Sequence, residues 1–535
     1  MTGKLSFSAA VAKCGLAVAL FLFSVTAFSQ IRIIDVRDEL VRGPAFNASH
    51  SSLRPILVDT LNYYPDIQLR KKHSKLYRAL VFKHFIYYGD STGVNFSVDP
   101  LMNFHFGISP SSAGPADTLY SMNTRGIKLE GNIGKQFTFV TMFYENQGTF
   151  VPYVDQYIRE TGASIGMGRV KAFKDKSDSW LYRAVGMRSK PGFDFAMATG
   201  MIVYRPIKHA EIWFGHGKNF IGSGYRSLLL SDNSVNYPHL RLSYGFWGNR
   251  LRYQVIYAQL STGRRYTSFS GTEGAFITKD ATINYLTFSQ SKRFEIGLFE
   301  STLWRRYQNN RQTPLDAMRF NPLIWVNSLS QGLSAQNNAM VGMTILYRPW
   351  RDVTMYGQLM LDGPRKNGAQ VGISKANLLV PNLFVRGEVN IVSRGSYATT
   401  DSLDNYTQFR QPLAHPMGAG FTELTGTVGY RYDRWVFNVQ SSVAVFPGGY
   451  DGYGRNLLYP DQQNIETQTV SNQPVSPSSY YFVNPTIGLI VNPSRNLQFT
   501  LGGIFRKVTT EQADVKSSYI FVGLSTNLNN LYFDF

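Results

Sequence analysis

The chain has 535 residues, of which 14% are aromatic and 17% are charged, with 47 glycines and a formal net charge of +19. Cys14 is the one cysteine and lies among the first 29 residues, so the remaining chain can form neither a disulfide framework nor a thiolate metal site. No later segment approaches the roughly 20 apolar residues of a spanning helix. This profile suits a transmembrane β-barrel, and a secreted soluble all-β protein is the alternative.

Residues 1–29 have the pattern of a secretory signal peptide. Lys4 and Lys13 precede an apolar run over 15–28, and small residues at 27 and 29 precede a predicted cleavage site before Gln30. A retained membrane anchor is the alternative, but the apolar run is shorter than a spanning helix requires. We therefore expect an exported protein whose positive charge favours lipid phosphates or acidic polysaccharide as partners, and not nucleic acid.

Residues 30–88 form a predicted N-terminal periplasmic or plug segment. Leu69, His73, Leu76, Tyr77 and Leu80 follow helical spacing, which predicts a short amphipathic helix. The basic face of this helix could contact lipid phosphates, or the helix could pack in the mouth of a barrel.

Residues 89–535 form the predicted outer-membrane barrel. Apolar and polar residues alternate on both sides of short turns, which predicts β-hairpins over 240–257, 341–361, 424–443 and 487–501. Short turns alternate with long loops such as 446–484, as in outer-membrane barrels with tight periplasmic turns and long extracellular loops. At about 25 residues per strand and connection, we expect an all-β antiparallel barrel of about 16 to 20 strands.

One strand face and the end of the chain add two expectations. Arg386, Glu388 and Asn390 share a face, which we expect to line the lumen because charge on the lipid side is costly. The end of the chain, residues 518–535, is expected to form a terminal aromatic strand with Leu531, Phe533 and Phe535 on one face. Such a strand resembles the signal that the barrel assembly machinery reads.

The most informative stretch is 209–242, in which two strand-like segments flank a loop rich in glycine, polar and aromatic residues. The glycines permit positive φ and close backbone approach, while the side chains supply donors, acceptors and a stacking ring. The loop could hold a polar ligand, or its polar groups could satisfy only one another. Between two barrel strands it must reach the cell surface or fold into the lumen, with Tyr225 and Arg226 expected at its tip.

Residues 217–242, GKNFIGSGYRSLLLSDNSVNYPHLRL, resemble the core motif of the Wzi-type capsule assembly family, in the Bacteroidetes branch that includes the gliding-motility protein RemB. Residues 123–154, 321–342, 355–362 and the LYFDF end support the resemblance. It implies an outer-membrane barrel with an N-terminal helical segment that acts as a lectin-like anchor for surface polysaccharide. In the gliding branch it also implies a role in surface motility.

The leading hypothesis is therefore a barrel without enzymatic activity or cofactor that binds or assembles capsule or exopolysaccharide. Its predicted partners are surface polysaccharide and outer-membrane lipid or lipopolysaccharide. We expect aromatic rings to stack on sugar faces and polar groups to form hydrogen bonds. The predicted carbohydrate-binding residues are Trp213, Lys218, Asn219, Tyr225, Arg226, Asp232 and Asn233. A passive porin or transport channel is the alternative.

A lipid- or glycan-modifying enzyme is the third hypothesis. Ser223 lies between two glycines but has no evident base partner. His209, Glu211 and His216 lie close together in the sequence, which suggests an acid/base or metal cluster, but the HExxH spacing is absent. We predict no catalytic or metal site. An enzyme of this kind would lose turnover on Ser223→Ala or His216→Ala.

Overall fold

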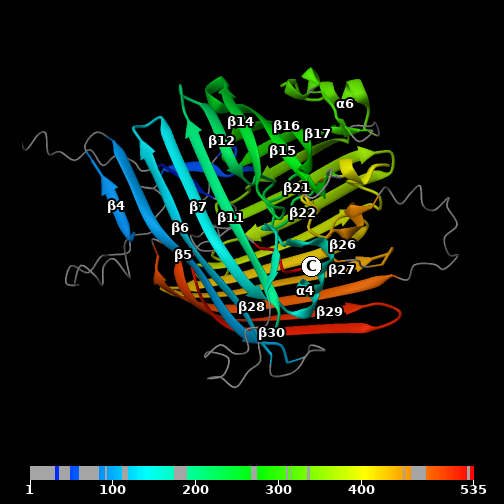
Figure 1. Cartoon of the computed structure of the whole chain (residues 1–535). Helices are drawn as coiled ribbons and strands as arrows, with labels where there is room; N and C mark the ends of the chain where they lie inside the picture. Colours follow the sequence, from blue (N-terminus) through cyan, green and yellow to red (C-terminus); the bar gives the residue numbers. More distant parts are fainter. Residues whose placement is uncertain are drawn as a thin grey trace, which may run out of the picture.

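The computed structural model describes residues 31–34, 49–59, 84–90, 93–110, 118–173, 190–266, 274–308, 311–314, 316–333, 338–449, 452–459, 477–493, 495–526 and 531–535. Within these residues, 18 antiparallel strands close into a single barrel (Figure 1), which falls in the predicted range. The predicted signal peptide and the predicted helix around residues 69–80 lie outside the described residues.

The barrel wall follows the chain order, and the last strand pairs back with the first. Its strands are β5 (Val94–Ile108), β6 (Leu119–Ile133), β7 (Phe137–Thr149), β11 (Gly192–Tyr204), β12 (Ala210–Gly217), β14 (Tyr237–Phe246), β15 (Leu251–Arg265), β16 (Phe276–Ser291), β17 (Phe294–Arg305), β20 (Ala339–Tyr347), β21 (Val353–Gly363), β22 (Lys366–Lys375), β23 (Leu383–Val392), β26 (Phe421–Tyr432), β27 (Trp435–Phe446), β28 (Ser478–Asn492), β29 (Leu497–Thr509) and β30 (Asp514–Ser525).

Shorter elements accompany the wall. Short strand pairs are β1 (Ile31–Ile34) with β3 (Ile56–Asp59), β2 (Leu53–Arg54) with β13 (Phe220–Ile221), β8 (Ala163–Ser164) with β9 (Gly168–Arg169), β18 (Tyr307–Gln308) with β19 (Arg311–Gln312), and β24 (Thr407–Gln408) with β25 (Gln411–Pro412). β4 (Ile86–Gly89) and β10 (Lys171–Phe173) pair with the first residues of β5 and β11. The helices are α4 (Pro152–Thr161), α6 (Val326–Gln331), and the single-turn η2 (Trp247–Asn249), η3 (Ala317–Phe320), η4 (Ser402–Asp404) and η5 (Arg455–Leu458).

The four predicted hairpins are confirmed as β14/β15, β20/β21, β26/β27 and β28/β29. Their turns share one end of the barrel with most of the other short turns, and we call it the short-turn end. Most of the long connections, among them 393–420, leave the opposite, long-loop end. The predicted asymmetry between the two ends is therefore confirmed.

The outer surface of the wall is apolar and the inner surface is polar. On β26, Leu424 is 57% exposed on the outside, while the neighbouring Glu423 is fully buried inside. On β23, Val389 and Ile391 are exposed, and Glu388 and Asn390 are buried, so the predicted lumen face is confirmed. Exposed aromatic side chains gather at the short-turn end: Tyr244, Phe246, Trp247, Tyr347, Trp350, Tyr432 and Trp435. Among the described residues, no helix is long and apolar enough to cross a bilayer.

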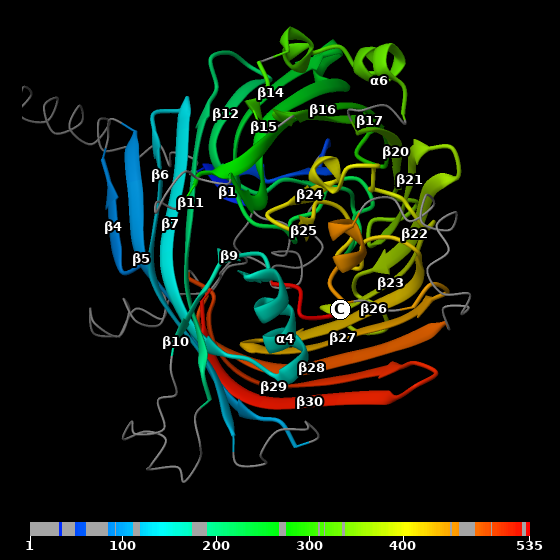
Figure 2. The ribbon, with the colours of Figure 1, turned by 45° about the vertical axis from the view of Figure 1, so that its right-hand side comes forward.

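Segments from distant parts of the chain occupy the interior of the barrel (Figure 2). They include α4, the β24/β25 hairpin and the end of the chain. Residues 49–54 also lie inside, where Ser52 accepts a hydrogen bond from Tyr285 on β16 and His50 N donates to Glu295 on β17. The lumen therefore contains packed protein drawn from both halves of the chain.

The structure corrects the expectation for residues 531–535. The wall closes through β30, which ends at Ser525, while Tyr532, Asp534 and Phe535 are buried inside the barrel. The Tyr153 hydroxyl on α4 donates to the backbone oxygen of Phe533 at 2.9 Å. The aromatic residues at this end pack against α4 and the lumen, where apolar side chains leave water, instead of alternating on a wall strand.

Candidate functional site

Residues 218–236, between β12 and β14, turn into the barrel, and we call them the inward segment. A side chain at Gly222, which has a φ of +146°, would collide with Gln358. A side chain at Gly224 would collide with Glu388. Gln358 accepts the backbone N–H of Leu228 at 2.7 Å, which fixes the segment against β21. The expectation that these glycines permit a tight fold inside the barrel is confirmed.

Arg226 is the centre of a buried charge cluster. Its guanidinium is fully buried and lies 3.0 Å from Glu423 on β26 and 3.1 Å from Asp534. Its backbone N–H donates to Glu388 at 3.1 Å, and His415 Nε2 lies 2.7 Å from Glu423. Burial alone would lower the pKa of Arg226, but Asp534 and Glu423 raise that pKa well above its usual value. The guanidinium therefore stays charged and joins three parts of the lumen.

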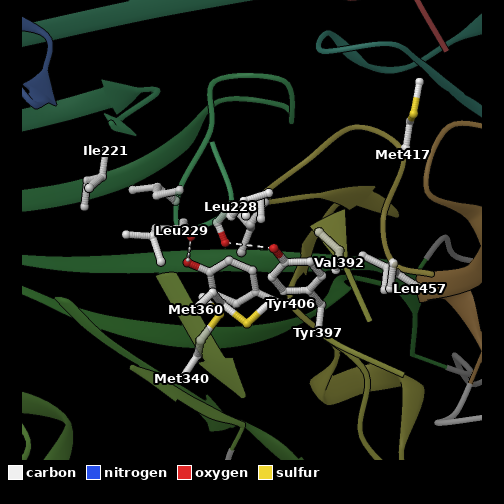
Figure 3. Packing of buried hydrophobic residues seen from close by; sticks show 14 of the residues in the cluster. Ile221, Leu228, Leu229, Met340, Met360, Val392, Tyr397, Tyr406, Met417 and Leu457 are labelled. Carbon is white, nitrogen blue, oxygen red and sulfur yellow. Dashed lines mark hydrogen bonds between the residues drawn. The ribbon is translucent and has the colours of Figure 1, made fainter. Parts of the chain in front are cut away.

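The apolar part of the inward segment packs on two tyrosines from the 393–420 connection (Figure 3). The Tyr397 hydroxyl donates to the backbone oxygen of Leu228 at 2.8 Å, and the Tyr406 hydroxyl donates to that of Leu229 at 2.9 Å. All four residues are buried in one hydrophobic cluster that also contains Met360 on β21. The long connection and the inward segment therefore hold each other in place.

The end of the inward segment is bound by other interior elements. Asp232 accepts a hydrogen bond from the Tyr532 hydroxyl. Asn233 Nδ2 donates to the backbone oxygen of Pro412 at 2.7 Å, and the Tyr453 hydroxyl donates to the backbone oxygen of Asn233 at 2.8 Å. Polar side chains that looked available for a ligand therefore satisfy buried backbone and side-chain groups of the chain itself.

Trp213 lies on β12, and Asn219 lies at the start of the inward segment that follows this strand. The Trp213 ring is 1% exposed, and the Arg241 guanidinium lies 3.8 Å from its centroid. Trp213 Nε1 donates to Glu211 at 2.9 Å, and Arg241 donates to Asn219 Oδ1 at 3.2 Å. These contacts form a cation–π and hydrogen-bonded cluster on the inner wall.

The structure brings the seven predicted carbohydrate-binding residues inside the barrel but leaves little of them accessible. Trp213, Asn219, Arg226, Asp232 and Asn233 are each at most 2% exposed. Only Lys218 and Tyr225 are half-buried, and the Tyr225 hydroxyl donates to Asp534 at 2.6 Å. Arg226 is held inside and does not form an exposed tip. Direct sugar contact by the seven residues stays a prediction.

The residues weighed for catalysis do not converge. His209 lies in the turn before β12, Glu211 pairs with Arg252 at 3.0 Å, and His216 Nδ1 lies 3.0 Å from the backbone oxygen of Ala198. Residues 89–93 carry a GxSxG spacing, but residues 91 and 92 lie outside the part of the chain that the structure describes. The described residues contain no group of three His, Cys, Asp or Glu that could hold a metal.

An accessible set of basic and aromatic side chains lies at the long-loop end. We call it the basic aromatic cluster, and it consists of Arg264, Arg265, Tyr266, Tyr307 and Arg410. Tyr266 and Tyr307 meet edge to face with centroids 5.1 Å apart. Arg264 is exposed and the other four residues are half-buried. The cluster therefore combines guanidinium groups and aromatic rings at one end of the barrel.

Two interior elements position the arginines of this cluster. Arg264 donates to the Ser402 hydroxyl at 3.2 Å, and Arg410 donates to the backbone oxygen of Thr161 at the end of α4 at 3.1 Å. Burial, and then the positive charge of Arg264, lower the pKa of Arg410. The repulsion between two guanidinium groups held close together favours an anion bound between them.

Sequence reasoning missed this cluster because its members come from three distant parts of the chain, which are the end of β15 with Tyr266, the segment after β17 and the 393–420 connection. No fixed spacing links Arg264, Tyr307 and Arg410. The β24/β25 hairpin brings Arg410 near Arg264, and Tyr307 on β18 meets Tyr266. Phe409 N donates to the backbone oxygen of Ser261 at 2.7 Å, which joins this hairpin to β15 near its long-loop end. The run Arg264-Arg265-Tyr266, which follows the predicted hairpin over 240–257, was the one available signal.

No protein-family model matches the sequence, and comparison with curated proteins finds no match. Among solved structures, the chain is similar to Wzi, an outer-membrane protein involved in group 1 capsule assembly in Escherichia coli and described as a carbohydrate-binding β-barrel. The TM-score is 0.48 at 12% identity, covering 81% of this chain and 85% of Wzi. It is also similar to OprD of Pseudomonas aeruginosa, with a TM-score of 0.41 at 9% identity, covering 81% and 96%.

A third similar structure is OccK2 (OpdF) of Pseudomonas aeruginosa in complex with glucuronate. Its TM-score is 0.43 at 7% identity, covering 81% of this chain and 98% of OccK2. At these identities the likeness concerns the barrel fold alone, and no function is taken from it.

Proposed function

We propose that this protein is an outer-membrane barrel that binds acidic capsular or exopolysaccharide at its long-loop end and attaches it to the cell. The observation that carries the proposal is the basic aromatic cluster, in which Arg264 and Arg410 are close enough to repel each other, and Tyr266, two residues beyond Arg264, packs against Tyr307. Arginine binds carboxylates through two parallel hydrogen bonds, and aromatic rings offer flat apolar surface to a sugar face. A polymer with acidic sugars matches both features.

Membrane placement is supported by the wall itself. A closed antiparallel barrel pairs its wall strands without an open edge, and its outer face exposes apolar residues with aromatic side chains at the short-turn end. The long-loop end then faces the outside of the cell, where surface polysaccharide lies. The resemblance of residues 217–242 to the Wzi-type family supports the same function, and its gliding branch extends the proposal to surface motility.

In this proposal, the inward segment acts as a scaffold and not as the contact surface. It ties β21, β23 and β26 to the 393–420 connection, which carries Arg410. The predicted carbohydrate-binding residues would then support binding by fixing the loops above them. The same packed interior supports a binding protein over a passive channel, since a wide channel needs an open lumen.

The partners and the absence of catalysis remain proposals of the same kind. Lipopolysaccharide would contact the outer wall, and the barrel assembly machinery would insert the protein in the membrane. Because the terminal residues 531–535 lie inside the barrel, the wall strand β30 is the segment that this machinery would have to read. We propose no catalytic residue and no cofactor.

Purified protein in detergent provides the direct test, with a glycan array that contains neutral and uronic acid polysaccharides. We expect binding to acidic polymers and a loss of about tenfold or more in affinity for the Arg264→Ala/Arg410→Ala variant, since hydrogen bonds between charged groups contribute about 1.5–3 kcal/mol each. Arg351→Ala, an exposed arginine at the short-turn end, is the matched control and should bind like the native protein.

Three other results would contradict the proposal. Equal binding by the native protein and the double variant would show that the polysaccharide does not bind at the basic aromatic cluster. A large single-channel conductance in a planar bilayer without glycan binding would favour a passive channel. Turnover of a lipid or glycan that Ser223→Ala or His216→Ala abolishes would favour an enzyme.

A further inference from the structure

The connection between β17 and β20 contains a flap on the outside of the barrel. We call residues 316–333 the outer flap; they include η3 and α6. Figures 1 and 2 show α6 beside β16 and β17, on the side away from α4 and the end of the chain. The Tyr257 hydroxyl on β15 donates to the backbone oxygen of Phe320 at 3.0 Å, and the Tyr253 hydroxyl donates to that of Pro322.

The wall beneath the outer flap carries an unusual polar patch on its outer face. Glu300 on β17 is paired with Val341 on β20, in register with the exposed outward residues Met343 and Ile345. On the other side it is paired with Asn284 on β16, whose amide donates to Glu300 at 3.1 Å. Glu300 therefore faces away from the lumen, on the surface that elsewhere is apolar.

The outer flap donates hydrogen bonds to the Glu300 carboxylate and buries it. Glu300 is 0% exposed and accepts the backbone N–H of Trp325 at 2.7 Å, and from Ser328 both the backbone N–H at 2.8 Å and the hydroxyl at 2.6 Å. Asp280, farther along the outer face of β16, pairs with Arg319 of the flap and with Arg306. The flap therefore shields two outward-facing acids.

The position of Glu300 on the wall places this shielding within the membrane. Phe294 marks the short-turn end of β17, and six residues of strand rise about 20 Å along its axis. If the apolar band of the wall begins near Phe294 and is about 25 Å tall, the strand tilt of barrels places Glu300 within it. Without the outer flap, the Glu300 carboxylate would face lipid, so the flap is needed to shield it.

Residues 320–333 of the outer flap expose large apolar side chains and carry no charge. Phe320 is 57% exposed, Leu323 61%, Trp325 40% and Leu329 83%. Residues 320–333 include no Asp, Glu, Lys or Arg. The strand β20, which pairs with β17, carries the exposed apolar residues Met343 and Ile345 on the same outer face. In a loop that faces water, exposure of these apolar side chains would be unfavourable.

We propose that the outer flap is a lipid-binding surface that inserts Phe320, Leu323, Trp325 and Leu329 among the acyl chains of the outer leaflet. The flap replaces a polar part of the wall with an apolar one and so completes the lipid-facing belt at β15, β16 and β17. The inference rests on the membrane placement in the proposed function but is independent of polysaccharide binding.

The test is a cysteine scan of the full chain in phosphatidylcholine vesicles, in a Cys14→Ser background. Leu329→Cys and Leu323→Cys are labelled with an environment-sensitive nitrobenzoxadiazole fluorophore, and quenching by doxyl-labelled lipid is compared with quenching by aqueous iodide. Val371→Cys, 70% exposed on the outer face of β22, is the lipid-facing control. Gln512→Cys, in the exposed β29/β30 turn at the long-loop end, is the water-facing control.

We expect the labels at 329 and 323 to lose fluorescence to doxyl lipid to the same extent as the label at 371, and to resist iodide. Iodide quenching like that of the label at 512 would overturn the inference. Shielding from both quenchers, with disulfide-linked dimers of Leu329→Cys, would also overturn it and assign the flap to a second copy of the chain. If doxyl lipid also failed to quench the label at 371, both the membrane placement and the inference about the outer flap would be wrong.

Discussion

Arg226 is the residue on which the interior of the barrel depends most. Removing one partner of a buried ion pair leaves the other charges uncompensated, which typically costs about 3–5 kcal/mol. We predict that Arg226→Met destabilises the native state by an amount of this order, because Glu423 and Asp534 then face each other without a cation. Thermal unfolding in detergent measures the effect.

Arg351→Met is the control for this substitution, because Arg351 is exposed in a short turn and should leave the unfolding temperature unchanged. Equal unfolding temperatures for the Arg226→Met and native proteins would show that the cluster does not hold the lumen together.

His415 gives the interior a predicted pH dependence. Burial lowers the pKa of His415 below its ordinary value near 6.5, although Glu423 acts in the opposite direction. Between these two pKa values the unfolded chain binds the proton more readily, so the contribution of His415 to stability falls as pH drops below about 6.5. We predict that the native protein loses more stability than His415→Gln between about pH 7.5 and pH 5.5.

Unfolding temperatures at the two pH values check this prediction. His209→Gln, in a short turn outside the lumen, should lose as much stability as the native protein on acidification. A His415→Gln variant with the same loss as the native protein would assign the pH dependence to other groups.

At the scale of elements, the strands of the wall could be predicted and the contents of the lumen could not. Hairpins such as β26/β27 alternate apolar and polar residues because one face meets lipid and the other meets protein or water, and that period of two is visible in the chain. Counting such units gave a range that includes the observed 18 strands.

The interior follows no local period, because its contacts join residues that are distant in sequence. Arg226 binds Asp534 across 308 positions, and nothing near residue 534 indicates that residues 531–535 leave the wall. The seven candidate residues were chosen for their chemistry, which also suits buried packing. The outer flap could not be predicted for the same reason, because the sequence does not show that Glu300 lies on the outer face of its strand.

Gly224 tests whether the close contact of the inward segment with the wall is required. An added methyl group would collide with Glu388, and overpacking typically costs about 1–3 kcal/mol. We predict that Gly224→Ala destabilises the interior and increases hydrogen exchange of residues 225–232. Gly387→Ala on β23 is the matched control, because a methyl group there meets open space. Similar exchange in both variants would argue against a tight fit.

For the whole molecule, the packed interior predicts a poor channel. The inward segment, the β24/β25 hairpin and α4 share the lumen, so we predict low ion conductance for the native protein in planar bilayers. Arg226→Met should increase conductance if it loosens these segments, whereas Arg351→Met should not. A native protein that conducts as well as an open porin would contradict this prediction.

The attachment of polysaccharide to living cells tests the central claim most directly. A deletion strain is complemented with the native gene, with Arg351→Ala, or with Arg264→Ala/Arg410→Ala, and polysaccharide is measured on washed cells and in the medium. We predict that the native and Arg351→Ala genes restore cell-bound polysaccharide, while the double variant, present in the outer membrane at equal amount, releases it into the medium. Full retention of polysaccharide by the deletion strain or by the double variant would contradict the account.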